Sequence, residues 1–381
     1  MKMYLMTPGP TPVAPETNLA MAQPIIHHRS PLFMEILGEV RADLKYLFET
    51  EQEVMIFAAT GTGAMEGAVA NTLSPGDTAL VVDGGKFGER WTELCNVYGV
   101  KVERLAVTWG QAVKPQDVAK MLDANAAIKA VFVQANETST GVSHPIKELA
   151  EVTAKRPGTI LVVDAISALG GYAIPMDKWG IDVLVAGSQK AMMLPPGLAF
   201  AALSPKAWGF VKESKCPKYY FNFSKALKSA EKNQTPYTSP VSLILGLREV
   251  LGKIKQVGLQ KIYAHNARLS KACKAAMQAM GLELYSKDYP STVLTAVLAP
   301  AGVDGQKVVA ELRKKGIWIA GGQAEAKGKI FRIAHMGFID TVDLLGTIGG
   351  LEEVLTALGY KVQPGAGLKA AQEVLAKEAV A

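Results

Sequence analysis

The chain has 381 residues, of which 49% are apolar and 20% are charged, a composition that excludes disordered, collagen-like and coiled-coil proteins. Its 41 basic and 35 acidic residues give a net charge of +6. The chain has no block of five or more basic residues, so the sequence does not predict binding to nucleic acid. At about 150 residues per domain, this length predicts two or three domains.

Cysteine spacing and hydropathy limit the cellular location of the protein and the kinds of site that it can form. Cys95, Cys216 and Cys273 have neither the spacing of a Cys-rich metal site nor that of a disulfide framework. No apolar run reaches the roughly 18 residues of a membrane span. Prolines follow the N-terminal apolar stretch too soon for a signal peptide. We therefore expect a cytoplasmic protein with no metal, no membrane segment and no nucleic-acid partner.

The N-terminal half predicts an α/β domain. Five prolines within residues 1–24 exclude a long helix, so we expect an extended arm there, followed by a helix over residues 30–48. Short apolar runs then alternate with amphipathic segments. The predicted strands cover residues 54–58, 78–82, 101–107, 130–134, 160–163, 183–186 and 199–203, and the predicted helices cover 64–73, 87–98, 116–122 and 146–154. This pattern is typical of a mostly parallel sheet between two layers of helices, which binds ligands at the carboxyl ends of its strands.

The pattern changes after Pro236 and Pro240. A long helical region is predicted over about 241–280, and a smaller α+β domain follows it. The predicted elements of that domain are strands at 292–298 and 330–334 and helices at 305–315 and 342–358. The predicted boundaries are an arm over 1–24, a large domain over 25–255, a small domain over 256–365, and a tail over 366–381 that is either a peripheral helix or frayed.

One lysine follows a buried strand. Residues 183–190 read Val-Leu-Val-Ala-Gly-Ser-Gln-Lys, so Lys190 lies near the carboxyl end of a strand among apolar neighbours. Desolvation there would lower the pKa of its amine and make it a nucleophile towards carbonyl carbons. A lysine that simply reaches solvent from a strand end is the alternative interpretation.

Polar groups also follow other strands. Asp164 ends an apolar strand, where it could hold Mg²⁺, a histidine or a protonated ring nitrogen, or cap the next helix. Thr138 follows another strand, where its hydroxyl could bind a ligand oxygen or shape a turn. Gly61 and Gly63 begin a helix after a strand, an arrangement whose free amides bind anions. Arg332 lies inside an apolar strand of the small domain, where it needs a carboxylate from the protein or from a substrate.

These parts together are what a pyridoxal phosphate (PLP) site requires. The glycine turn suits the phosphate, the acid suits the pyridine nitrogen, and the lysine suits Schiff-base formation and proton transfer. The first four features all follow strands, so they should meet at one edge of the sheet.

The chain resembles the class V family of fold-type I PLP-dependent aminotransferases, most closely the alanine–glyoxylate and serine–glyoxylate (serine–pyruvate) enzymes. The likeness runs from Thr7-Pro8-Gly9-Pro10 to Phe331-Arg332-Ile333, and it is most specific in the segments 164–171 and 187–197. It implies a large domain with a mostly parallel sheet between helices, a smaller C-terminal α+β domain, and PLP as cofactor.

The resemblance also implies roles for individual residues. Lys190 would form the Schiff base with PLP, Asp164 would pair with the pyridine nitrogen, and Thr138 would bond near the phenolic oxygen. Arg332 would bind the substrate α-carboxylate, and Gly9 is assigned to the same substrate site. Thr62, Gly63 and Gln189 would hold the phosphate. Phe87 would stack on the ring at a position where relatives often have Trp. Ala64, where some relatives have a larger residue, and Thr238 are the remaining implied cofactor contacts.

The implied reaction is ping-pong transamination from alanine or serine to glyoxylate or pyruvate. Thr238 matches a segment that reaches the phosphate of the neighbouring subunit in the family, which implies a homodimer with sites at the interface. Relatives that carry Tyr three residues before this threonine differ here, because this chain has Thr235.

Several alternatives remain at this stage. A nicotinamide-dependent dehydrogenase would use Gly61, Gly63, Gly67 and Asp83, but it leaves Lys190 unexplained. A non-catalytic subunit of a soluble hydrogenase complex would leave the same lysine idle. A cysteine desulfurase needs a mobile catalytic cysteine, and Cys216 lies well before the region where such a cysteine would fall. A phosphonate or phosphoserine donor is also open, since His27, His28 and Arg29 could supply cationic contacts. Aspartate is open as well, since its second carboxylate could meet Arg29 or a side chain of a dimer partner.

Overall fold

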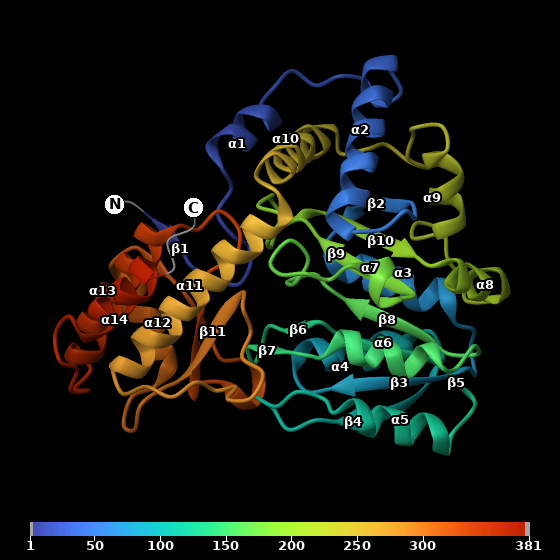
Figure 1. Ribbon diagram of the computed structural model, residues 1–381. Helices are drawn as coiled ribbons and strands as arrows, with labels where there is room; N and C mark the ends of the chain where they lie inside the picture. The colour runs from blue at the N-terminus through green and yellow to red at the C-terminus, as the bar shows by residue number, and fades with distance from the viewer. Residues whose placement is uncertain (1–2, 378–381) are drawn as a thin grey trace.

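A seven-stranded sheet forms the centre of the molecule (Figure 1). The computed structural model describes residues 3–377. Neighbouring strands follow the order β2-β10-β9-β8-β5-β3-β4, and all are parallel except β10, which is antiparallel to both neighbours. The strands are β2 (Val54–Ala59), β3 (Thr78–Asp83), β4 (Lys101–Ala106), β5 (Ile128–Gln134), β8 (Ile160–Asp164), β9 (Val183–Gly187) and β10 (Gly197–Leu203).

Helices cover both faces of this sheet, because side chains alternate between the two faces along each strand. On one face, side chains such as Val163 and Leu184 pack against α2 (Pro31–Phe48), α5 (Pro115–Ala124), α6 (Ile146–Ala154), α7 (Met176–Trp179) and α10 (Val241–Val257). On the other face, their neighbours Val162 and Val185 pack against α3 (Gly61–Thr72), α4 (Lys86–Val97), α8 (Pro205–Glu213) and α9 (Phe223–Ala230). The predicted α/β fold with a mostly parallel sheet is confirmed.

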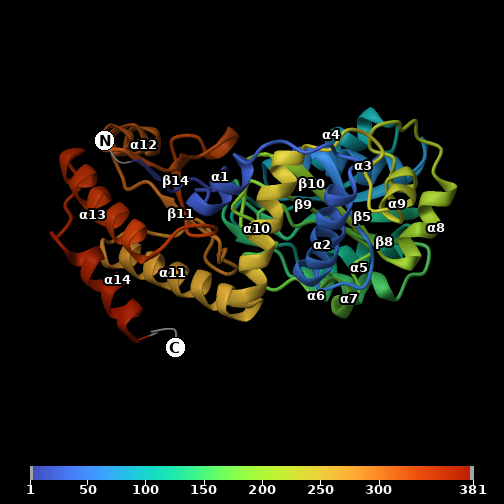
Figure 2. The ribbon, with the colours of Figure 1, turned by 90° about the horizontal axis from the view of Figure 1, so that it is seen from above.

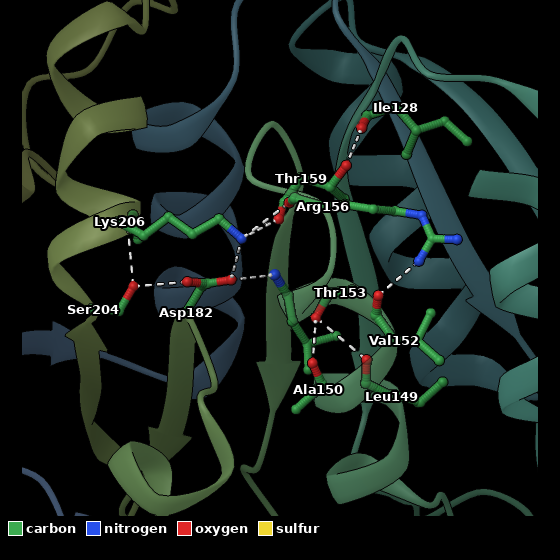
Figure 3. Close-up of polar contacts among 12 residues, drawn as sticks. Ile128, Leu149, Ala150, Val152, Thr153, Arg156, Thr159, Asp182, Ser204 and Lys206 are labelled. Atoms are coloured by element: carbon green, nitrogen blue, oxygen red, sulfur yellow. Dashed lines mark hydrogen bonds and ion pairs between the residues drawn. The ribbon is translucent and has the colours of Figure 1, made fainter. Parts of the chain in front are cut away.

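A polar network fixes the amino ends of the central strands (Figure 3). Asp182, just before β9, accepts hydrogen bonds from Ser204 Oγ at 2.8 Å and from Leu161 N at 3.0 Å. The Lys206 ammonium bonds the Thr159 carbonyl oxygen and lies 3.4 Å from Asp182 Oδ2. This network holds the edge of the sheet opposite to the strand ends that carry the candidate site residues, so those strands keep a fixed register.

The C-terminal part has its own apolar core beside the sheet (Figure 2). Helix α11 (Leu259–Ala279) runs from the sheet into this part and packs against α14 (Ala366–Lys377). The remaining elements there are β11 (Leu294–Leu298), α12 (Gly305–Lys314), β12 (Ile317–Trp318), β13 (Ala320–Gly321), the 3₁₀ helix η1 (Ala324–Ala326), β14 (Ile330–Ala334) and α13 (Thr341–Ala357). A smaller C-terminal α+β unit is therefore present, whereas the boundaries at 24, 255 and 365 stay predictions.

The N-terminal segment joins the two parts. Strand β1 (Tyr4–Leu5) pairs in parallel with β12, and the Met6 carbonyl oxygen accepts from Ala334 N at 2.9 Å. Farther along, Thr11 N donates to the Gln189 carbonyl oxygen at 3.1 Å. This segment therefore crosses from the C-terminal core to the loop that follows β9.

The structure corrects several expectations. Residues 1–24 were expected to be extended, but α1 (Pro15–Met21) is a helix, which begins at a proline because the missing amide is unneeded there. The region 241–280 is two helices, because Gly258 interrupts it at φ +87°. Helices α8 and α9 were not predicted.

The tail forms a docked helix over its described part. Ala371 and Leu375 of α14 are buried in the C-terminal core, so the helical alternative holds there, and residues 378–381 lie outside the described residues. Within residues 3–377, no helix has the length and apolarity to cross a membrane.

Candidate active site

Four parallel strands bring the predicted residues to one edge of the sheet. A cavity of about 210 Å³ lies beyond the carboxyl ends of β2, β5, β8 and β9. Its lining residues are Thr60, Gly61, Thr62, Phe87, Arg90, Thr138, Asp164, Ile166, Ser167, Gln189 and Lys190. Six of the residues singled out from the sequence as catalytic or cofactor-binding therefore line one cavity.

Lys190 follows β9 in a short loop and is half-buried. Its Nζ donates to the Pro8 carbonyl oxygen at 2.5 Å, and Thr11 Oγ1 donates to the Lys190 carbonyl oxygen at 2.7 Å. Desolvation by the surrounding protein lowers the pKa of the Lys190 amine to about 8. More of this amine is therefore neutral and nucleophilic near neutral pH than of an ordinary lysine amine.

Asp164 is the last residue of β8 and is buried. Its Oδ1 accepts from Ile166 N at 2.8 Å. The pKa of this carboxyl is raised to about 7, mainly by burial and also by the nearby Glu137, against the opposing effects of the Ile166 amide, Arg90 and Lys190. The carboxylate forms no ion pair among the described residues, so it is suited to hold a cationic group of a ligand.

The N-terminus of α3 offers hydrogen-bond donors to an anion. Thr60 occupies the N-cap position without using its side chain as a cap, which leaves first-turn amides free of that partner. A Cβ on Gly61 would collide with Ile166, and one on Gly63 would collide with Phe221 and Ala59, so only glycine fits this turn. The cavity can thus receive a phosphate here.

Thr138 and Arg332 connect the cavity to the small unit. Thr138 Oγ1 lies 2.7 Å from Ser167 Oγ, and Arg332 Nη1 donates to the Thr138 carbonyl oxygen at 2.7 Å. Arg332 also donates from Nε and Nη2 to the Gly321 carbonyl oxygen, at 3.1 and 2.7 Å. Burial lowers the pKa of Arg332 to about 10. Within residues 3–377, Arg332 has no carboxylate in ion-pair contact, so the structural ion pair considered above is absent from that range.

Sequence reasoning overlooked Glu137 and Arg90. The fully buried Glu137 carboxylate accepts from Gly88 N and Phe87 N, both at 3.1 Å, and from Gln134 Nε2 at 2.7 Å, so it fixes the start of α4 that carries Phe87. Arg90 lies on the same helix and faces the cavity. The signal for Glu137 was an acid directly after a buried strand, but the position of Arg90 depends on how α4 packs.

Five predicted residues do not line this cavity: Gly63 and Arg332, described above, and Ala64, Thr238 and Gly9. Ala64 is buried inside α3, and Thr238 is exposed in the segment before α10. Gly9 lies against Lys190, and a Cβ at Gly9 would overlap the lysine amine. Asp83, the acid of the dinucleotide pattern, forms an ion pair with Arg104 instead of reaching the cavity.

The residues present fit PLP. Within residues 3–377, the buried Gln189 Oε1 has no hydrogen-bond partner, and Gln189 lines the same cavity as Gly61 and Thr62 of the α3 turn. An amine, a carboxyl beside it and an anion-binding helix start are the three groups that a pyridine aldehyde phosphate needs. The donor set of the cavity therefore matches this cofactor.

Fold and cavity together define a PLP-dependent transferase of fold type I, and the comparisons give the family. Residues 16–339 match the family model described as Aminotransferase class-V. The chain belongs to the class V aminotransferases. Membership and the structural neighbours imply pyridoxal phosphate as the cofactor and transamination as the reaction.

Three curated relatives cover nearly the whole chain. The soluble hydrogenase small subunit of Synechococcus sp. is 42% identical over 98% of both chains. The L-aspartate–glyoxylate aminotransferase of Paracoccus denitrificans is 36% identical over 97% of this chain and 95% of its own. The serine–glyoxylate aminotransferase of Methylorubrum extorquens is 34% identical over 99% of this chain and 97% of its own.

Solved structures agree with this family. The ureidoglycine–glyoxylate aminotransferase of Bacillus subtilis has a TM-score of 0.94 at 29% identity, covering 99% of this chain and 98% of its own. The alanine–glyoxylate aminotransferase of Nostoc sp. has a TM-score of 0.90 at 29% identity, covering 93% of this chain and 96% of its own. The predicted fold type is thereby confirmed.

Proposed function

We propose that this protein transfers the amino group of alanine or serine to glyoxylate or pyruvate. The observation that carries the proposal is the half-buried Lys190 amine, with a pKa lowered to about 8, in one cavity with the buried Asp164. The names of similar proteins support glyoxylate as the acceptor. Four aminotransferases, named for aspartate, serine, alanine and ureidoglycine, all carry glyoxylate in their names.

Bound PLP supplies an electron-withdrawing ring that stabilises negative charge at the substrate α-carbon. Lys190 is proposed to hold the cofactor and then to move a proton from that α-carbon, a task for which a pKa near the working pH is suited. Asp164 is proposed to keep the ring nitrogen protonated. Its burial strengthens this contact, because charges attract more strongly where water is excluded.

The remaining assignments concern the two ends of the site. Phe87 is proposed to cover the ring and Thr138 to bond beside its phenolic oxygen. Thr62, Gly63 and Gln189 are proposed to hold the phosphate. Ala64 lies under this turn and supports it by close packing inside α3.

Arg332 is proposed to bind the substrate carboxylate. Its guanidinium is buried and positively charged, and within residues 3–377 it bonds only carbonyl oxygens, so a carboxylate would supply the missing negative charge. Gly9 is proposed to keep the space beside Lys190 open for the substrate.

A monocarboxylic donor is favoured over aspartate or a phosphorylated donor. A second anionic group would need a cation beyond Arg332. Arg29 does not line the cavity and donates to Gln234 Oε1 at 2.7 Å, and Arg90, which lines it, bonds Thr62 at the turn where the phosphate is proposed to bind. A hydrogenase-subunit role is not favoured by the site, because it assigns no task to Lys190, Asp164 or Arg332.

We also propose a cytoplasmic homodimer whose two sites lie at the interface. Thr238 is exposed and does not line the cavity of its own chain, as expected for a residue that serves the partner's site. All three cysteines are free, which fits a reducing compartment. The domain boundaries at residues 24, 255 and 365 are retained as part of the proposal.

A donor panel tests the reaction. PLP-loaded protein is given glyoxylate with L-alanine, L-serine or L-aspartate, and glycine and the matching keto acid are measured together. We expect equal amounts of both products, fastest with alanine or serine. Arg332→Gln should raise the KM of the donor by tenfold or more while PLP stays bound. Faster turnover with aspartate would contradict the proposed donor, and no glycine with any donor would contradict the acceptor.

A further inference from the structure

The phosphate of PLP brings a charge that the assigned phosphate residues do not balance. A phosphate monoester carries about −1.5 to −2 charges near neutral pH. Thr62, Gly63 and Gln189 are neutral, and Ala64 has no polar side chain. Helix α3 contributes only a partial positive charge at its N-terminus. Among the residues that line the cavity, only Arg90 and Lys190 can be cationic.

Lys190 does not serve this end of the cavity. Its amine is directed to the Pro8 carbonyl oxygen at 2.5 Å, on the N-terminal segment, and it belongs to the chemistry proposed above. Arg90, by contrast, contacts the α3 turn itself. Its Nη1 donates to Thr62 Oγ1 at 3.1 Å, so the guanidinium lies at the first turn of α3, where the phosphate is proposed to bind.

The Arg90 guanidinium also keeps hydrogen-bonding capacity for a ligand. It is half-buried, and within residues 3–377 no carboxylate forms an ion pair with it. Its Cζ lies 4.9 Å from the centre of the Phe87 ring, which fixes its direction. Of its five N–H groups, only one donates to a protein acceptor in this range, which leaves a planar fork suited to phosphate oxygens.

We propose that Arg90 binds the phosphate group of PLP and supplies the positive charge at that end of the site. The proposal rests on the proposed function, since it takes PLP as the ligand. Arg90 reaches the phosphate beside the Thr62 hydroxyl at the N-terminal turn of α3.

A purely structural role for Arg90 makes a different prediction. If the residue only supported the Phe87 ring, its loss would weaken every ligand that stacks on that ring, with or without a phosphate. Comparing PLP with pyridoxal, which lacks the phosphate, therefore separates the two roles.

The test measures equilibrium binding to protein freed of cofactor. Dissociation constants for PLP and for pyridoxal are determined by absorbance titration for the wild-type protein, Arg90→Gln and Arg90→Lys. We expect Arg90→Gln to weaken PLP binding by tenfold or more, because a charge-assisted contact is lost, and to change pyridoxal binding less than twofold. The PLP dissociation constant of Arg90→Lys should fall between those of the wild-type protein and Arg90→Gln, since lysine keeps the charge but lacks the planar guanidinium fork.

Arg104→Gln is the matched control. Arg104 pairs with Asp83 on the neighbouring strand and does not line the cavity, so its loss should leave both dissociation constants unchanged. Circular dichroism and thermal unfolding of each variant check that the chain is folded.

Two results would overturn the inference. Equal weakening of PLP and pyridoxal by Arg90→Gln would assign Arg90 to the ring support, and unchanged PLP binding would remove it from the site. A wild-type protein that binds neither ligand would instead contradict the proposed function, so the two failures are distinguishable.

Discussion

Lys190 and Asp164 share one cavity, and desolvation moves their pKa values towards each other, to about 8 and about 7. Each group alone would be uncharged over part of the neutral range, which is the condition in which an amine attacks and a carboxyl exchanges a proton. Each also stabilises the charged form of the other, as expected for neighbours of opposite charge.

The raised pKa of Asp164 predicts a pH-dependent stability in the protein without PLP. The Asp164 carboxyl is more protonated in the folded chain than in the unfolded chain between pH 3.8 and about 7, so its contribution to the free energy of unfolding should fall as the pH rises through this window. Lys190 is protonated in both states there and does not contribute to this slope. In Asp164→Asn, the decrease in the free energy of unfolding over this window should be smaller by on the order of 2–4 kcal/mol.

Thermal unfolding at pH 5 and pH 7 measures this effect. The wild-type protein should lose more stability between the two pH values than Asp164→Asn does. The exposed Asp288 is a matched control, and Asp288→Asn should behave like the wild-type protein. The same pH slope in Asp164→Asn as in the wild-type protein would show that Asp164 does not carry the proton.

Gly9 tests how closely the N-terminal segment approaches the lysine. Its φ of +128° disfavours any side chain, and a Cβ would overlap the Lys190 amine. Gly9→Ala should therefore cost about 1–3 kcal/mol of stability and lower the amount of PLP bound. Gly209→Ala in α8, where a Cβ meets no atom within 4 Å, is the control. Bound PLP per chain at the wild-type level in Gly9→Ala would contradict this account.

At the scale of residues, the sequence predicted the groups that directly follow strands. Lys190, Asp164 and Thr138 could be placed at one edge because parallel strands end together. Arg90 and Glu137 were not assigned, because their roles depend on contacts between elements distant in the sequence. Glu137 binds the start of α4, and Arg90 of α4 bonds Thr62 of α3. Gly9 was assigned only through the family resemblance, since it lies 181 positions before Lys190 in the chain.

At the scale of elements, Gly258 sets the angle at which the C-terminal unit leaves the sheet. Helices α10 and α11 meet at this residue, whose φ is +87° and ψ is +138°. Apolar periodicity continues across it, which is why the sequence predicted one helical region. The glycine conformation, which periodicity does not reveal, ends the first helix.

Two glycine substitutions separate these effects. Gly258→Ala should destabilise the protein by about 1–3 kcal/mol, because its backbone conformation strains any side chain. Gly252→Ala lies inside α10 with no atom within 4 Å of its Cβ, so it should stabilise the protein by about 0.5–1 kcal/mol. Unfolding curves of both variants check this. A stabilising effect of Gly258→Ala would show that the junction of α10 and α11 needs no glycine.

At the scale of the whole molecule, the site depends on two parts of the chain and, by our proposal, on a second subunit. Arg332 comes from the C-terminal unit and bonds the Thr138 carbonyl oxygen of the sheet unit, so the two units together form the substrate end. The exposed Thr238 does not line the cavity of its own chain. A second subunit would give this threonine a phosphate to contact.

Light scattering and PLP binding test the dimer together. We expect a mass twice the 40.6 kDa of one chain. Thr238→Ala should weaken PLP binding several-fold, the loss expected for one hydrogen bond to a charged group, without lowering the thermal stability of the PLP-free protein. A monomer that binds PLP as tightly as the dimer would contradict the interface sites.

The visible absorption spectrum of the purified protein tests the central claim most directly. With PLP added, we predict a yellow band that needs Lys190, fades when L-alanine or L-serine is added, and returns when glyoxylate follows. Lys190→Ala should not complete this cycle, because it lacks the amine that holds the cofactor and moves the proton. A protein that takes up no PLP, or whose band does not respond to any amino donor, would contradict the assignment of a transaminase site to this cavity.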